Sequence, residues 1–115
     1  MDVTWGSYHR RQEILRLVVQ RAEQGLVDRP WHGLRGLTAE FEGDAEVLQE
    51  LHRWWVRVLV ARLHSLELRA CPASVYGEVA AAHPGLRRVL DEYADHPALA
   101  EGMRRERAML GAVAA

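Results

Sequence analysis

The sequence contains a single cysteine, Cys71, and no lysine or asparagine. One cysteine excludes an internal disulfide and a zinc site of the cysteine-rich kind. All fifteen basic residues are arginine, which we interpret first as the codon bias of a GC-rich genome. No apolar run reaches the length of about eighteen residues that a transmembrane helix needs. The N-terminal residues, MDVTWGSYHRRQEI, lack the apolar core of a signal peptide. Together these absences favour the cytoplasm.

Several function classes find no support in the sequence. The net charge is −1 with the histidines neutral, and charges of both signs are mixed along the chain. A nucleic-acid-binding domain would concentrate positive charge on one face, so no nucleic-acid partner is expected. A phosphate-binding glycine loop and a Gly-x-Ser-x-Gly elbow are absent. No two carboxylates stand apart from the solvated helix faces as a candidate acid–base pair. The sequence therefore favours a protein without enzymatic activity.

What the sequence does contain is one long helical stretch, residues 44–69, without glycine or proline. Its apolar sector spans about 200°, wider than the stripe of a surface helix. We therefore expect it to be the central helix of an all-α, single-domain bundle over residues 1–115. The predicted apolar sector comprises Val47, Leu48, Leu51, Trp55, Val58, Leu59, Leu63 and Leu66, widened by Ala45, Trp54, Val56 and Ala61.

Two further long helices and two short ones are expected around this centre, each bounded by glycine, proline or a capping residue. The first begins with Ser7 as N-cap and stops at Gly25. A single helical turn is expected after Thr38, between the longest irregular stretch, 26–37, and Gly43. In the short helix that follows Pro84, Arg87 is predicted to face solvent. The expected ranges are about 7–24, 74–82, 86–93 and 97–113.

Two polar residues, His52 and Arg62, fall within the apolar sector of the central helix. Burial of such groups costs several kcal/mol unless they are paired. One hypothesis is a ligand pocket with His52 and Arg62 as polar contacts and Trp54 or Trp55 as a wall, Arg62 stacking on Trp55. The alternative is structural: Arg62 reaches solvent or a neighbouring carboxylate, and His52 bonds a backbone carbonyl. The two lie about 15 Å apart along the helix axis, too far to share a small site unaided.

Four tryptophans accompany only one phenylalanine. Trp5 and Trp31 fall in segments predicted to be irregular, where a large aromatic side chain either plugs the end of a bundle or meets a partner. A partner-facing tryptophan would be partly solvated in the monomer and belong to an apolar patch. The sequence leaves both alternatives open.

Six histidines raise the question of a metal site. Di-iron bundles use Glu-x-x-His on facing helices, and zinc proteases use His-Glu-x-x-His. Neither pattern occurs in this sequence. The pairs that do occur fall on predicted polar faces or at helix ends, so no metal and no other cofactor is predicted. These pairs are His9 with Glu13, His64 with Glu67, and Glu92 with His96.

Residues 10–25, RRQEILRLVVQRAEQG, resemble the first helix of TetR-family repressors, which often begins with a basic pair and Ile-Leu. In that family a second apolar helix and a recognition helix follow at once. Here the chain continues into LVDRPWHGLRGLTAEFEG, which is interrupted by one proline and three glycines. The resemblance therefore implies no DNA binding for this chain.

The main hypothesis is a small cytoplasmic protein that binds a protein partner or a second copy of itself, without catalysis. It rests on the wide apolar sector and on Trp5 and Trp31 as interface candidates. The alternative is a small-molecule-binding bundle, or an enzyme built on the same pocket. Its site residues would be His52, Trp54, Trp55 and Arg62.

Overall fold

The computed structural model describes residues 5–65 and 72–114, and within them it contains six helices and no strand. The long helices are α1 (Trp5–Glu23), α3 (Asp44–Ser65) and α6 (Pro97–Ala114). The short ones are α2 (Leu37–Glu40), α4 (Pro72–Ala82) and α5 (Pro84–Glu92). The all-α prediction is confirmed, and α2 takes the place of the single turn expected after Thr38.

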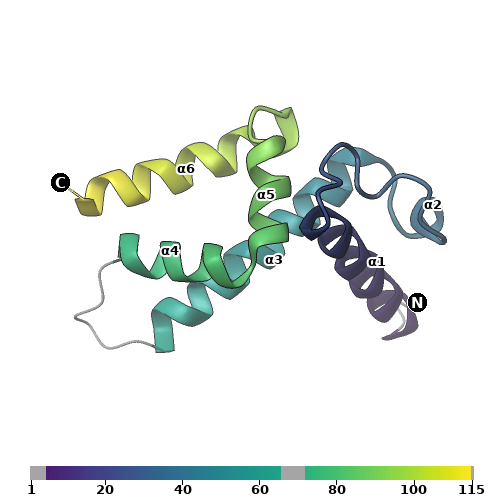
Figure 1. The fold of residues 1–115 in the computed structure, drawn as a ribbon, viewed down its shortest axis with the longest axis horizontal. Helices are drawn as coiled ribbons and strands as arrows, with labels where there is room; N and C mark the ends of the chain where they lie inside the picture. The colour runs from purple at the N-terminus through teal and green to yellow at the C-terminus, as the bar shows by residue number, and fades with distance from the viewer. Residues whose placement is uncertain (1–4, 66–71, 115) are drawn as a thin grey trace.

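The central position of α3 is also confirmed (Figure 1). It contacts α1, α4, α5 and α6. The helices α1 and α2 lie toward one end of the molecule, α4 and α6 toward the other, and α5 crosses between them. The predicted apolar sector is nevertheless wider than the buried one, because Ala45, Val56 and Ala61 are exposed. The buried residues of α3 are Val47, Leu48, Leu51, Trp55 and Leu59.

The first helix ends where the sequence predicts. Gly25 has a φ of 97°, a left-handed conformation that glycine adopts without the steric cost of a Cβ atom. Its N–H donates to the carbonyl of Ala22 at 3.0 Å, and the N–H of Leu26 donates to the carbonyl of Arg21 at 2.9 Å. This is the Schellman arrangement, which satisfies the last carbonyls of a helix.

Two predicted helix starts are displaced. The helix α1 begins at Trp5, so Ser7 is not its N-cap but lies inside its first turn. There the Ser7 hydroxyl donates to a carboxylate oxygen of Glu40 at 2.6 Å, which ties α1 to α2. The helix α4 begins at Pro72 instead of Ser74, because proline suits the first position of a helix. The predicted end of the central helix, 66–69, lies outside the described residues.

The irregular stretch between α1 and α2 is held to the bundle by Trp31. This side chain is buried, and its indole N–H donates to Asp44 at the start of α3 at 2.8 Å. Its ring lies 5.2 Å from that of Tyr93, and the Tyr93 hydroxyl accepts a hydrogen bond from the N–H of Arg29 at 2.8 Å. Trp31 is therefore a plug at one end of the bundle.

The segment after α1 does not form the helix pair that the repressor-like opening would require, since α2 has only four residues. Within the described ranges, none of the helices combines the length and the hydrophobicity of a membrane-spanning segment.

Candidate functional site

A groove of about 280 Å³ lies between α3 and α6. On the α3 side it is lined by His52, Trp55, Val56, Leu59, Val60 and Leu63. On the α6 side it is lined by Gly102, Arg105 and Glu106. Val56 and Val60, one helical turn apart, remain 40% and 43% exposed, whereas Leu59 is buried. The groove thus has an apolar floor and an apolar wall open to solvent.

A buried ion pair closes the inner side of this groove. The guanidinium of Arg87 donates to Glu106 at 3.1 Å, and both side chains are only 8% exposed. The indole N–H of Trp55 donates to the same carboxylate at 2.5 Å. The guanidinium also donates to Asp91 at 2.7 Å and lies over the rings of Trp55 and Tyr76, at 4.7 and 5.4 Å from their centroids. Every charge in this cluster therefore has a partner.

The prediction that Arg87 faces solvent is wrong. The helix α5 packs against α1, α3 and α4. In addition, Glu106 of α6 contacts the Arg87 side chain. Arg87 is therefore covered by neighbouring helices instead of facing solvent. Burial alone would lower the pKa of Arg87. The hydrogen bond to Asp91 and the charge of Glu106 outweigh burial and raise the pKa of the guanidinium. Arg87 is therefore a charged link between α5, α3 and α6.

His52 lies at the contact between α3 and α6. Its ring packs so closely on Gly102 that a Cβ atom added there would come within 2.7 Å of His52 Cε1. Among the described residues, no hydrogen bond to the ring of His52 occurs, so the predicted bond to a backbone carbonyl is not formed. The pKa of His52 is lowered, mainly by burial. The negative charge of Glu106 acts to raise this pKa, and the positive charge of Arg87 acts to lower it further. The neutral imidazole is therefore favoured in the folded protein.

This environment predicts a stability loss in mild acid. As the pH falls below about 6.5, the unfolded chain binds a proton at His52 before the folded protein does. The stabilisation present above that pH is therefore lost as the pH decreases. The measurement is the midpoint of urea unfolding, followed by circular dichroism at several pH values between about 7.5 and 5.5. We expect this midpoint to decrease less steeply with falling pH in His52→Gln than in the wild type. Equal slopes for the two proteins would contradict the assignment.

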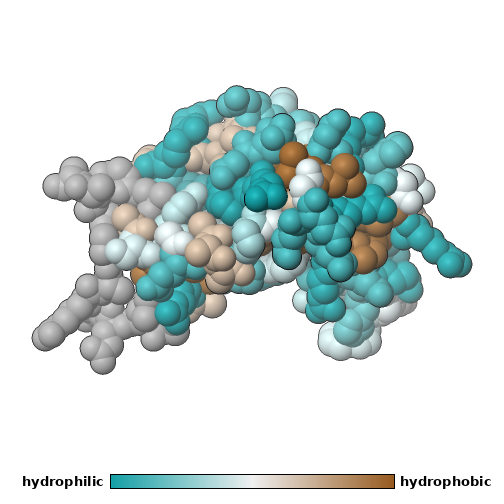
Figure 2. All heavy atoms as spheres, viewed as in Figure 1, coloured by the Kyte–Doolittle hydropathy of each residue, from teal (hydrophilic) through white to brown (hydrophobic). Residues whose placement is uncertain are grey.

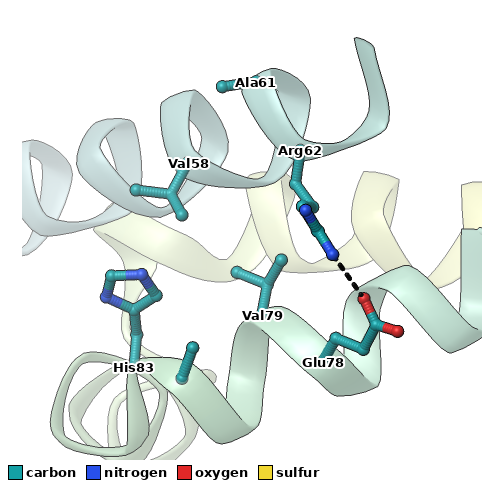
Figure 3. Close-up of a pocket in the computed structure, with 7 residues that line it drawn as sticks. Val58, Ala61, Arg62, Glu78, Val79 and His83 are labelled. Carbon is teal, nitrogen blue, oxygen red and sulfur yellow. Dashed lines mark hydrogen bonds and ion pairs between the residues drawn. The ribbon is translucent and has the colours of Figure 1, made fainter. Parts of the chain in front are cut away.

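A second groove, of about 500 Å³, lies between α3 and α4. Figure 3 shows Val58 of α3 and Val79 of α4 in the space between the two helices, with Arg62 and Glu78 bridging them. The Arg62–Glu78 distance is 3.3 Å, and the side chains are 49% and 59% exposed. An ion pair this exposed adds little stability. Arg62 thus pairs with a carboxylate on a neighbouring helix, the contact that the structural alternative predicts.

The structure separates the four predicted ligand-binding residues. His52 and Trp55 line the groove between α3 and α6, while Arg62 lines the groove between α3 and α4. Trp54 lines neither of these grooves and is a half-buried residue packed against the core. The cation that stacks on Trp55 is Arg87, not Arg62.

Sequence reasoning missed five residues of this region: Val60, Arg87, Gly102, Arg105 and Glu106. The last two lie on a helix whose exposed face is rich in arginine and glutamate, so their pattern is that of an ordinary solvated face. Only Arg105 shows a local signal, its i,i+4 spacing from Glu101, and the two side chains pair at 2.7 Å. That pair marks a helix surface, however, and does not indicate a groove.

The two interface candidates differ in exposure. Trp5 is 74% exposed and forms an aromatic cluster with Tyr8 and His9, whose ring centroids lie 5.9 and 4.5 Å from its own. Trp31 is buried and out of a partner's reach in this structure. Figure 2 shows a mostly hydrophilic face with hydrophobic residues in separate patches. Among the described residues of this face, therefore, no single broad apolar patch marks an interface.

Within the described residues, no group of three or more histidine, cysteine, aspartate or glutamate side chains is placed to hold a metal ion. Comparison with protein-family models, curated proteins and solved structures gives no match to this chain. The geometry of the groove between α3 and α6 is therefore the basis for a functional proposal.

Proposed function

We propose that this protein is a non-catalytic binding module and that the groove between α3 and α6 is its binding site for an apolar ligand. The observation that supports this most directly is the exposed pair Val56 and Val60 beside a hollow floored by Leu59. Small-molecule sites are concave and mostly apolar, with a few polar groups that orient the ligand. His52 and Arg105 are the polar groups of this kind.

Catalysis at this groove has less support. A general base or nucleophile needs a reactive group within reach of a substrate. Glu106 is occupied by Arg87 and Trp55, and none of the described residues that line the groove is a serine or a cysteine. His52 alone gives no nucleophile–base pair.

The single cysteine of the sequence remains our reason to place the protein in the cytoplasm.

The neutral fluorescent dye N-phenyl-1-naphthylamine tests the apolar site. We expect its emission to rise on binding to the folded wild-type protein. Val60→Glu and Val56→Glu place a carboxylate in the apolar wall, which should weaken binding about tenfold or more. The measurement is a fluorescence titration, accompanied by circular dichroism to show that each variant is folded.

Leu17→Glu is the matched control for these variants. Leu17 is 41% exposed, close to the exposure of Val56 and Val60, but it lies on α1 away from the groove. This variant should bind the dye as the wild type does. Equal weakening by Leu17→Glu and Val60→Glu, or no dye binding to the wild type, would refute the groove as the site.

A second candidate is the original main hypothesis, a protein partner or a second copy of this chain. The specific observation in its favour is the exposed aromatic cluster of Trp5, Tyr8 and His9. Aromatic side chains are enriched at the energetic centres of interfaces. Native mass spectrometry separates the two: a dimer lost in Trp5→Ala supports this candidate, and a monomer carrying a small adduct supports the groove.

A further inference from the structure

The charged groups of the groove between α3 and α6 differ in what they leave available to a ligand. Glu106 accepts hydrogen bonds from Trp55 and Arg87 and is buried with them. A cationic ligand would have to break that buried pair to reach the carboxylate, at a large energetic cost. Among the described residues that line the groove, no anion is therefore available to a ligand.

Arg105 is available by contrast. Its side chain is 77% exposed, and among the described residues its one ion pair is with Glu101, at 2.7 Å. An exposed i,i+4 pair is weak, so a ligand is able to compete for the guanidinium. Only one terminal nitrogen of Arg105 is used in that pair. The remaining N–H groups form a planar fork that matches a carboxylate.

His52 adds a second polar group on the opposite wall. Its ring lines the groove, and among the described residues it donates or accepts no hydrogen bond. A neutral imidazole carries one N–H donor and one acceptor nitrogen. A ligand head group placed between α3 and α6 therefore meets a cation from α6 and a hydrogen-bond donor from α3.

Building on the proposed function, we propose that the ligand is a small amphiphilic acid: a short aliphatic body on Val56, Leu59 and Val60, and one carboxylate held by Arg105 and His52. The size of the groove agrees with this. Its volume of about 280 Å³ lies just below the range of drug-sized small-molecule sites, roughly 300–1,000 Å³, as suits a short ligand. The sign of the available charge selects an anionic head group over a cationic one.

Octanoate and 1-octanol are the probes, since they share one chain length and differ in the head group. Each is titrated against protein loaded with N-phenyl-1-naphthylamine at about pH 7.5, where the carboxylate is ionised and His52 is neutral. We expect octanoate to displace the dye at an about tenfold lower concentration than octanol. Added salt should narrow this difference, because Arg105 is solvent-exposed.

Arg105→Gln should bring the two probes to equal potency, whereas Arg104→Gln should leave the preference for octanoate unchanged. Arg104 is the adjacent exposed arginine of α6 and does not line the groove. Equal potency of the two probes on the wild type would overturn the inference while the proposed function stands. A preference for octanoate over octanol that persists in Arg105→Gln would also overturn the inference and leave the proposed function standing. Failure of both probes and of the dye would overturn the inference and the proposed function together.

A second copy of the chain is the competing occupant. Sedimentation velocity on the wild type and on Val60→Glu, with and without octanoate, distinguishes the two. We expect both proteins to be monomeric, with and without octanoate. A dimer that dissociates both on Val60→Glu and on addition of octanoate would assign the groove to a second copy and overturn the inference.

Discussion

Replacing Glu106 by leucine is expected to destabilise the protein by about 3 kcal/mol, because it leaves the buried guanidinium of Arg87 without its innermost partner. Arg87 keeps Asp91, which is 63% exposed, so the loss falls at the low end of the range for a broken buried pair. The indole N–H of Trp55 also loses its acceptor, a cost of about 1–3 kcal/mol that is part of the total. The measurement is the free energy of unfolding from urea denaturation.

The double variant Arg87→Met with Glu106→Leu isolates the charge. Replacing both partners of a buried pair by apolar groups of similar size is often neutral. The double variant should therefore be more stable than Glu106→Leu alone and retain mainly the cost at Trp55. Glu101→Leu on the same helix is the control: its pair with Arg105 is exposed, and we expect a change within about 0.5 kcal/mol. A loss in Glu106→Leu no larger than in this control would contradict the buried pair.

The fold was predictable because its strongest signals are local. The absence of glycine and proline over residues 44–65 specifies the central helix, and the prolines at 72, 84 and 97 stand at the first residue of the three later helices. The errors lie at helix starts. At Ser7 the local preference for an N-cap is outweighed by a contact with Glu40, 33 residues away in the sequence.

The site was only partly predictable, because it depends on which faces meet. Helical periodicity identified His52 as a polar group within the apolar sector, placed Trp55 in that sector as a candidate pocket wall, and placed Val56 at its edge. It gave no means to pair Arg87 with Glu106, 19 residues away, or Trp55 with Glu106, 51 residues away. Arg87 stands next to exposed Arg88 on a nine-residue helix. Sequence alone does not tell which of two adjacent arginines a later helix will cover.

Gly85→Ala is expected to destabilise the protein by about 1–3 kcal/mol through overpacking. Gly85 lies at the start of α5, where this helix crosses α1. A Cβ atom there would lie 2.5 Å from the carbonyl oxygen of Val19 and 2.5 Å from Cγ of Glu23. The Glu23 side chain is able to rotate away, but the Val19 carbonyl belongs to the backbone of α1. The two helices must therefore separate, and the contacts of buried Val19 and Leu86 with their neighbours loosen.

Gly77→Ala is the matched control because it makes the same chemical change inside α4. A Cβ atom at Gly77 meets nothing within 4 Å, and alanine is favoured over glycine in a helix by about 0.5–1 kcal/mol. The two substitutions should thus shift the thermal midpoint in opposite directions, Gly85→Ala downward and Gly77→Ala upward. An upward shift for both would mean that α1 and α5 do not approach as closely as the structure shows. The position of α5, which carries Arg87 to Glu106, would then need revision.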